Sequence, residues 1–209
     1  MSLFVYTYGW LFRVLFPKML WKVKTNEKHI YLTFDDGPLP NITPFILEEL
    51  RKWNAQATFF CVGDNITKHP DIFDQIIAQG HTVGNHTFHH KKGTKTSNHE
   101  YYHDIDACQK LITTTNDRLL FRPPYGKLKF RQLHKISKKY SIVMWHILAG
   151  DFLPRMTVQK CLKILIRNTK KGSIIVLHDN QKTFHIVKEV LPHYLAYFTQ
   201  KGYQFKKLI

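Results

Sequence analysis

The chain has 209 residues, of which 44% are hydrophobic, and it carries a formal net charge of +16 at pH 7. This length and composition predict one globular domain with a sizeable core and exclude a disordered chain. The basic excess favours anionic partners such as acidic glycans, phosphate polymers or lipid head groups. The sequence lacks the basic helix or arginine–aromatic module typical of nucleic-acid readers, so no nucleic-acid partner is expected.

Residues 1–27 form a separate N-terminal segment ahead of the domain that we predict at 28–209. Its first 21 residues are rich in aromatic and aliphatic side chains, but Arg13, Pro17 and Lys18 interrupt the run. The run falls short of the roughly 20 mostly apolar residues of a membrane span, and no signal-peptide cleavage site is visible. Two interpretations stay open: a short apolar segment packed on the domain, or an interfacial anchor in peripheral contact with a membrane.

From residue 29 onward, strand and helix patterns alternate. The expected strands cover 29–35, 57–63, 82–85, 119–122, 141–147, 173–178 and 203–207. The expected helices cover 43–53, 70–79, 98–115, 129–139, 157–169 and 184–200. Strict alternation predicts an α/β fold of parallel strands joined by right-handed crossovers. About seven such units could close into a barrel or form an open doubly wound sheet, and the absence of a glycine-rich phosphate motif weakens the nucleotide-binding form of the latter.

The informative polar residues follow the C-terminal ends of these expected strands. Asp35 and Asp36 end the first strand, a histidine-rich stretch at 84–90 follows the third, and Arg122 follows the fourth. Asp151 follows the fifth strand, and the sixth ends at a histidine, residue 178. Active sites of parallel barrels and open α/β sheets are built at that edge. The pattern therefore predicts one active site assembled from distant stretches.

His86 and His90 are four residues apart, so a single helical turn would place both imidazoles on one face. Together with Asp36 they would supply two nitrogens and one oxygen, a set suited to zinc with an open position for water. His89 competes for the same role, since it would share a face with His86. A histidine-rich polar loop without metal is the plain alternative in a chain with 13 histidines.

Two further pairings follow from residue chemistry. The Arg122 guanidinium could pair with Asp35 and hold it ionised as a base, while the backbone N–H of Tyr125 could face an oxyanion. His178 next to Asp151 would become an imidazolium able to donate a proton. The alternatives are a rigid structural turn for the Arg-Pro-Pro-Tyr-Gly stretch and a satisfied core histidine for His178.

Five stretches taken in order resemble the motifs of the polysaccharide deacetylases, the family of the NodB homology domain, also called carbohydrate esterase family 4. They are Thr33–Gly37, His86–His90, Arg122–Gly126, Asp151–Phe152 and Val176–His178. The resemblance covers roughly Lys28 to Leu208. It implies a deformed (β/α)7 TIM-like barrel and a divalent metal, usually zinc, with cobalt or nickel as other transition metals that could serve.

The resemblance also implies a role for each matching residue. Asp36, His86 and His90 would bind the metal, which decides against His89. Asp35 would be the general base held by Arg122, Tyr125 would supply its backbone N–H to the oxyanion, and His178 would be the general acid tuned by Asp151. The residues that would contact substrate are Pro124, Phe152 and Val176.

Two departures from the family pattern concern the substrate pocket. Leu148 stands where members have the first carboxylate of Asp-x-x-Asp-Trp, and Phe152 replaces the tryptophan. Val176 takes the place of a leucine that lines the acetyl pocket. These changes touch pocket shape and substrate preference, and they leave the metal and proton-transfer residues intact.

The expected function is metal-dependent removal of N-acetyl groups from an acetylated glycan containing N-acetylglucosamine: peptidoglycan, chitin-like oligomers or poly-N-acetylglucosamine. The alternatives are an O-acetyl xylan esterase, a hydrolase of a non-sugar C–N amide, or a non-catalytic glycan-binding relative. The substrate class favours the cell envelope or a membrane-associated location, while the lack of a visible cleavable signal leaves a cytoplasmic one open.

Overall fold

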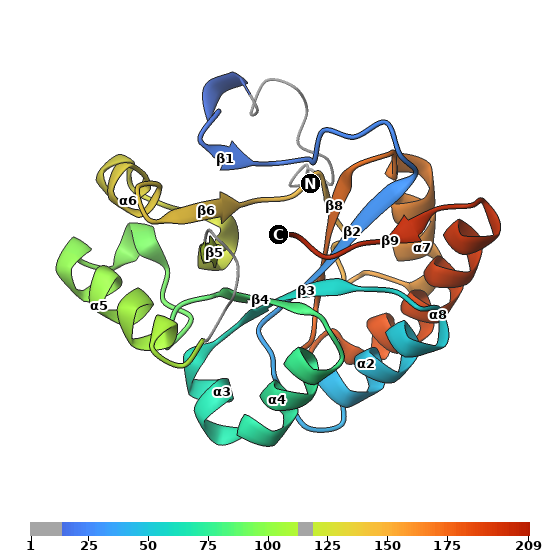
Figure 1. Cartoon of the computed structure of the whole chain (residues 1–209), viewed down its shortest axis with the longest axis horizontal. Helices are drawn as coiled ribbons and strands as arrows, with labels where there is room; N and C mark the ends of the chain where they lie inside the picture. Colours follow the sequence, from blue (N-terminus) through green and yellow to red (C-terminus); the bar gives the residue numbers. More distant parts are fainter. Residues whose placement is uncertain (1–13, 113–118) are drawn as a thin grey trace.

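The computed structural model describes residues 14–112 and 119–209, and all nine strands within these ranges belong to one curled parallel sheet (Figure 1). Among the described residues the strands are β1 Met19–Leu20, β2 His29–Asp35, β3 Ala57–Cys61, β4 Thr82–Asn85, β5 Leu119–Phe121, β6 Tyr140–Val143, β7 Ile147–Leu148, β8 Ser173–His178 and β9 Gln204–Phe205. The order across the sheet is β1-β6-β5-β4-β3-β2-β8-β7, with β9 also paired to β2. The α/β class and the deformed barrel predicted from the sequence are confirmed.

Helices surround the sheet on its outer side (Figure 1). They are α2 Thr43–Lys52, α3 Gly63–Lys68, α4 Pro70–Ala78, α5 Asn98–Gln109, α6 Phe130–Ile136, α7 Val158–Asn168 and α8 Phe184–Gln200, with 3-10 turns η1 Gly93–Lys95 and η2 Pro124–Gly126. The six expected helices are present. Helix α8 has the expected bounds, and α2, α4, α6 and α7 are shorter than expected. Helix α5 ends at Gln109, and residues 113–115 of the range expected for it lie outside the described residues. Helix α3 was not expected, because its six residues are too few to show an apolar period.

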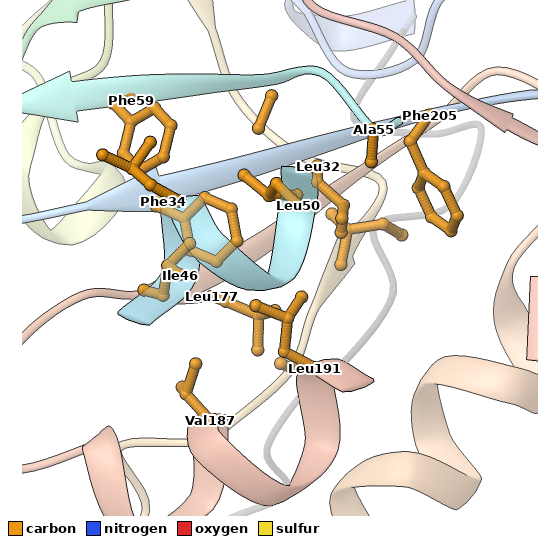
Figure 2. Packing of buried hydrophobic residues seen from close by; sticks show 14 of the residues in the cluster. Leu32, Phe34, Ile46, Leu50, Ala55, Phe59, Leu177, Val187, Leu191 and Phe205 are labelled. Atoms are coloured by element: carbon orange, nitrogen blue, oxygen red, sulfur yellow. The ribbon is translucent and has the colours of Figure 1, made fainter. Parts of the chain in front are cut away.

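The largest hydrophobic cluster packs β2 and β8 against α2 and α8 (Figure 2). Leu32 and Phe34 lie two apart on β2 and therefore point to the same face, where both are fully buried. Ile46 and Leu50 face them from successive turns of α2, and Leu191 approaches from α8. This packing fixes the position of β2, whose last residue opens the polar edge of the sheet.

The expected single strand at 141–147 is wrong, because the chain forms two strands there. Strand β6 lies near one end of the sheet and β7 at the other, next to β8. The three residues between them cross from one edge to the other: Met144 N–H donates to Leu20 O (2.8 Å), and His146 N–H donates to Ile174 O (2.9 Å). The sheet therefore curls far enough for three residues to connect β6, the strand next to β1 at one end, with β7 at the other end.

Part of the N-terminal segment packs where the chain crosses between β6 and β8. Met19 pairs with Ile142 of β6, while Val23 N–H donates to Gly172 O just before β8 (2.9 Å). Trp21, between them, is buried. Residues 1–13, which carry most of the prediction of a packed segment or membrane anchor, lie outside the described residues. No helix within 14–112 or 119–209 is long and apolar enough to cross a membrane.

Candidate active site

The polar edge of the sheet gathers residues from four strands. Asp35, the last residue of β2, pairs in register with Phe60 of β3 and with His178 of β8. His86 follows β4 directly, and Arg122 follows β5. The distant stretches that the sequence places at strand ends therefore meet at one edge.

Asp36, His86 and His90 each offer one ligand atom, and these three atoms lie within 4.8 Å of one another. His90 Nε2 is 3.2 Å and His86 Nε2 is 3.7 Å from Asp36 Oδ1. The expectation of a helical turn between the two histidines is wrong, because residues 86–90 are not helical. Positive φ angles at Thr87 (64°) and His90 (53°) bend the segment instead, and such sparsely populated backbone is common at functional sites.

The protonation of this cluster fits a divalent transition metal. His86 Nδ1–H donates to Arg122 O (2.7 Å), which leaves Nε2 with its lone pair facing Asp36. Burial lowers the pKa of His86 to about 4, so the ring is neutral at pH 7. Burial alone would raise the pKa of Asp36, but the imidazoles of His90, His178 and His86 lower it, and the carboxylate is ionised.

The two oxygens of Asp36 differ in their partners. Oδ2 accepts a hydrogen bond from Asn180 Nδ2 (2.6 Å), whereas Oδ1 is buried and accepts no well-aligned hydrogen bond from any described residue. An orphaned carboxylate oxygen facing two imidazole nitrogens is a donor set that suits zinc or a similar metal. The residues present therefore fit the implied metal.

His89, the competing ligand candidate, faces away from this cluster. Its Nδ1 lies 2.6 Å from Asp104 Oδ1, and Asp104 Oδ2 accepts hydrogen bonds from the backbone N–H groups of Phe88 and His89 (both 3.0 Å). Asp104 on α5 thus holds the loop in the shape that brings His90 towards Asp36. Sequence reasoning missed this role.

Arg122 is fully buried and holds Asp35. Its Nη1 donates to Asp35 Oδ1 (2.6 Å) and to Thr33 Oγ1 (2.7 Å). Its Nε and Nη2 donate to the carbonyls of Val143 (3.2 Å) and Met144 (2.9 Å) at the end of β6. These bonds occupy four of the five guanidinium N–H groups, and a buried charge pair is tolerated only when it is extensively hydrogen-bonded in this way. The result is a rigidly held carboxylate next to the metal-ligand cluster.

His178 and Asp151 form a second charged pair at the same edge. Asp151 Oδ1 contacts His178 Nδ1 (2.9 Å), and Oδ2 accepts from the His178 backbone N–H (2.8 Å). Burial by itself would lower the pKa of His178, but Asp151, with Asp36 and Asp35, raises it to about 10. The ring is therefore an imidazolium at neutral pH, and because Nδ1 is held, Nε2 is the atom free to donate a proton.

The remaining predicted residues surround these pairs. Tyr125 has a left-handed backbone (φ 59°) and an exposed side chain whose ring centroid lies 4.8 Å from that of His90. The half-exposed ring of Phe152 packs edge-on against His178 (5.2 Å). Pro124 and Val176 are buried, the latter in a cluster with Trp145. The oxyanion and substrate roles given to these residues stay predictions.

Two residues missed from the sequence follow His178 directly. Asn180 orients Asp36, as described above. Asp179 is buried and accepts hydrogen bonds from Gly37 N–H and Thr43 Oγ1 (both 2.8 Å), which ties the turn after β2 to α2. The sequence shows that both residues directly follow His178, which was the available signal. It does not show the direction in which each side chain points.

Comparison with known proteins identifies relatives of this chain. The family profile described as "Polysaccharide deacetylase" matches residues 22–145. A peptidoglycan-N-acetylglucosamine deacetylase of Bacillus cereus is 32% identical over 189 residues, covering 88% of each chain. A chitooligosaccharide deacetylase of Azorhizobium caulinodans is 35% identical over 163 residues, covering 76% of this chain and 77% of that protein.

Among solved structures, a crystallised peptidoglycan N-acetylglucosamine deacetylase superposes with a TM-score of 0.86 at 27% identity. The match covers 96% of this chain and 95% of that one. Fold, ordered motifs and sequence identity thus point the same way. The chain belongs to the polysaccharide deacetylase family, a group of hydrolases that act on carbon–nitrogen bonds other than peptide bonds.

Proposed function

We propose that this protein is a metal-dependent deacetylase that removes the acetyl group from N-acetylglucosamine units of peptidoglycan and releases acetate in the cell envelope. One observation carries the proposal: the cluster of Asp36, His86 and His90 lies close to both a carboxylate held by arginine and an imidazolium held by a carboxylate. The similarity to peptidoglycan deacetylases over most of the chain supports the choice of substrate.

The chemistry divides among the residues of the site. A divalent metal held by Asp36, His86 and His90 would polarise the acetyl carbonyl and lower the pKa of a water molecule. Asp35 takes the proton from the attacking water, and its ion pair with Arg122 keeps the carboxylate anionic and oriented.

Collapse of the tetrahedral intermediate needs two further groups. The backbone N–H of Tyr125 donates a hydrogen bond to the oxyanion. His178 Nε2 then protonates the leaving nitrogen, and Asp151 stabilises the imidazolium that performs this step. An amine is a poor leaving group, so breaking the C–N bond requires this acid.

The test is acetate release from peptidoglycan, chitooligosaccharides, poly-N-acetylglucosamine and acetylated xylan. Each is assayed as purified, after chelation, and after return of Zn²⁺, Co²⁺ or Ni²⁺. We expect release from peptidoglycan that stops on chelation. Release from xylan alone would identify an O-acetyl esterase, and metal binding with no release from any polymer would indicate a non-catalytic glycan-binding protein.

Two variants separate metal binding from proton transfer. Asp35→Asn should lower kcat by about 10²–10⁴-fold while the metal content stays at the wild-type level, because the ligand set is unchanged. His86→Ala should lose the metal, whereas His103→Ala, an exposed histidine on α5, serves as the matched control and should keep both metal and activity. Near-normal turnover by Asp35→Asn would show that the base is a different group.

A further inference from the structure

Two adjacent lysines follow the ligand His90, and they have different partners. Lys91 Nζ forms ion pairs with Glu100 Oε1 (2.5 Å) and Asp104 Oδ1 (3.9 Å). Lys92 has no acidic partner within 4.0 Å in the described parts of the chain. Its Nζ lies 5.6 Å from the centroid of the Tyr125 ring instead. The charge of Lys91 is therefore compensated within the protein, and the charge of Lys92 is not.

The uncompensated ammonium lies at the rim of the active site. Lys92 contacts the Tyr125 ring, this ring contacts the His90 ring, and His90 Nε2 lies 3.2 Å from Asp36 Oδ1. The Tyr125 side chain is 60% exposed, so a substrate at the cluster would meet the aromatic ring and the ammonium together.

The backbone of Lys92 is held in place. Its carbonyl oxygen accepts hydrogen bonds from Lys95 N–H (2.9 Å) and Thr96 Oγ1 (3.0 Å), which close the turn η1. Gln132 Nε2 donates to Gly93 O in the same turn (2.9 Å) and ties it to α6. Lys92 itself is half-buried, and its Nζ lies beside the exposed Tyr125 ring. Because the backbone of the turn is held, binding a ligand at Lys92 costs less conformational entropy than ordering a whole mobile loop would.

We infer that Lys92 forms a subsite for a carboxylate that the glycan carries next to the sugar being deacetylated. The lactyl group of an N-acetylmuramic acid neighbour is such a carboxylate wherever the stem peptide is absent, because the peptide would otherwise be joined to it as an uncharged amide. A chitooligosaccharide has no such group. The inference rests on the proposed function and names its substrate class: an acidic glycan in preference to a neutral one. The net charge of +16 attracts any polyanion, but only a charge at this position distinguishes the sugar beside the scissile amide.

The test compares three substrates of equal length. They are peptide-free strands of alternating N-acetylglucosamine and N-acetylmuramic acid, the same strands with each carboxylate converted to a methylamide, and chitooligosaccharides. Lys92→Gln should raise KM for the carboxylate strands about two- to five-fold, the range of a partly exposed ion pair, and leave KM for both neutral substrates unchanged. Lys92→Arg should restore the wild-type value.

Lys95→Gln is the matched control, because it removes the same charge from an exposed position on the same turn. Equal effects of Lys92→Gln and Lys95→Gln, or an equal effect of Lys92→Gln on all three substrates, would overturn the inference in favour of general electrostatic attraction.

Equilibrium binding, measured in the Asp35→Asn background, tests the subsite without turnover. Tighter binding of carboxylate strands that depends on Lys92 supports the subsite, even if the wild-type protein releases no acetate and the proposed function fails. Binding that ignores Lys92 refutes the subsite while leaving the deacetylase proposal standing.

Discussion

Replacement of Asp151 by asparagine should change the pH dependence of the reaction, because Asp151 is the main group that raises the pKa of His178 to about 10. The difference from the ordinary value of about 6.5 corresponds to about 5 kcal/mol in favour of the imidazolium. The asparagine side chain keeps the size of the aspartate but lacks its charge. The pKa of His178 should then fall, because burial disfavours the charged ring and only the more distant Asp36 and Asp35 still favour it.

The assay is the pH profile of kcat/KM for acetate release, which reports the pKa values of the free enzyme. A bound cation lowers the pKa of His178 in both proteins, so the predicted quantity is the difference between them. The alkaline limb of Asp151→Asn should lie below that of the wild type, by at most about 3 pH units, because Asp36 and Asp35 still raise the pKa of His178 in the variant.

An aryl acetate ester provides the internal control, since its phenolate leaves without protonation by an acid. Hydrolysis of this ester should change little in Asp151→Asn. The reasoning fails if both proteins keep the same alkaline limb on the amide substrate, because His178 would then not be the acid or Asp151 would not set its pKa.

Three other changes test the surroundings of the site. Arg122→Gln should lower the free energy of unfolding by about 3–5 kcal/mol in urea titrations, because it leaves the buried Asp35 unpaired. The matched control Arg131→Gln, at an exposed position, should change it by about 0.5 kcal/mol or less. Asn180→Ala should weaken metal binding about 10- to 100-fold in chelator competition, with its unfolding midpoint in the chelated state close to wild type. The raised pKa of His178 stabilises the fold fully below about pH 6.5, and unfolding titrations from pH 6 to 11 should show this contribution lost as pH rises through about 10.

The sequence predicts the fold well where local pattern and pairing agree. Alternating strands and helices require parallel pairing, and parallel strands share one carboxyl edge, so the meeting of Asp35 and Arg122 could be anticipated. The break between β6 and β7 could not, because Met144 and Trp145 continue an apolar run without any change of period. The chain changes its neighbouring strands there, from β5 and β1 to β8, and a local sequence pattern does not show which strands pair.

The site shows the same division. The residue types of the cluster were readable, but the reason why His90 rather than His89 faces Asp36 lies in left-handed backbone at Thr87 and His90 and in the contact of His89 with Asp104. The helical spacing proposed for these histidines was a wrong premise. The two histidines do lie close together, but a bent loop rather than a helical turn brings them there.

The carboxylates at this edge of the sheet are compensated to different extents. Asp35 pairs with Arg122 and Asp151 pairs with His178, while Asp179 accepts two hydrogen bonds. Among the described residues, Asp36 Oδ1 is the one buried carboxylate oxygen without a hydrogen-bond donor. A bound cation would therefore compensate this oxygen first.

A buried anion left unpaired is costly, and a cation that binds only the folded state stabilises it. Free Zn²⁺ at a hundred times its Kd should therefore add about 2.7 kcal/mol to the free energy of unfolding. In a chain of this size, each kcal/mol of added stability raises Tm by about 2–4 °C. The shift should vanish with chelator and in His86→Ala. An equal shift in His86→Ala would place the stabilising ion elsewhere on the protein.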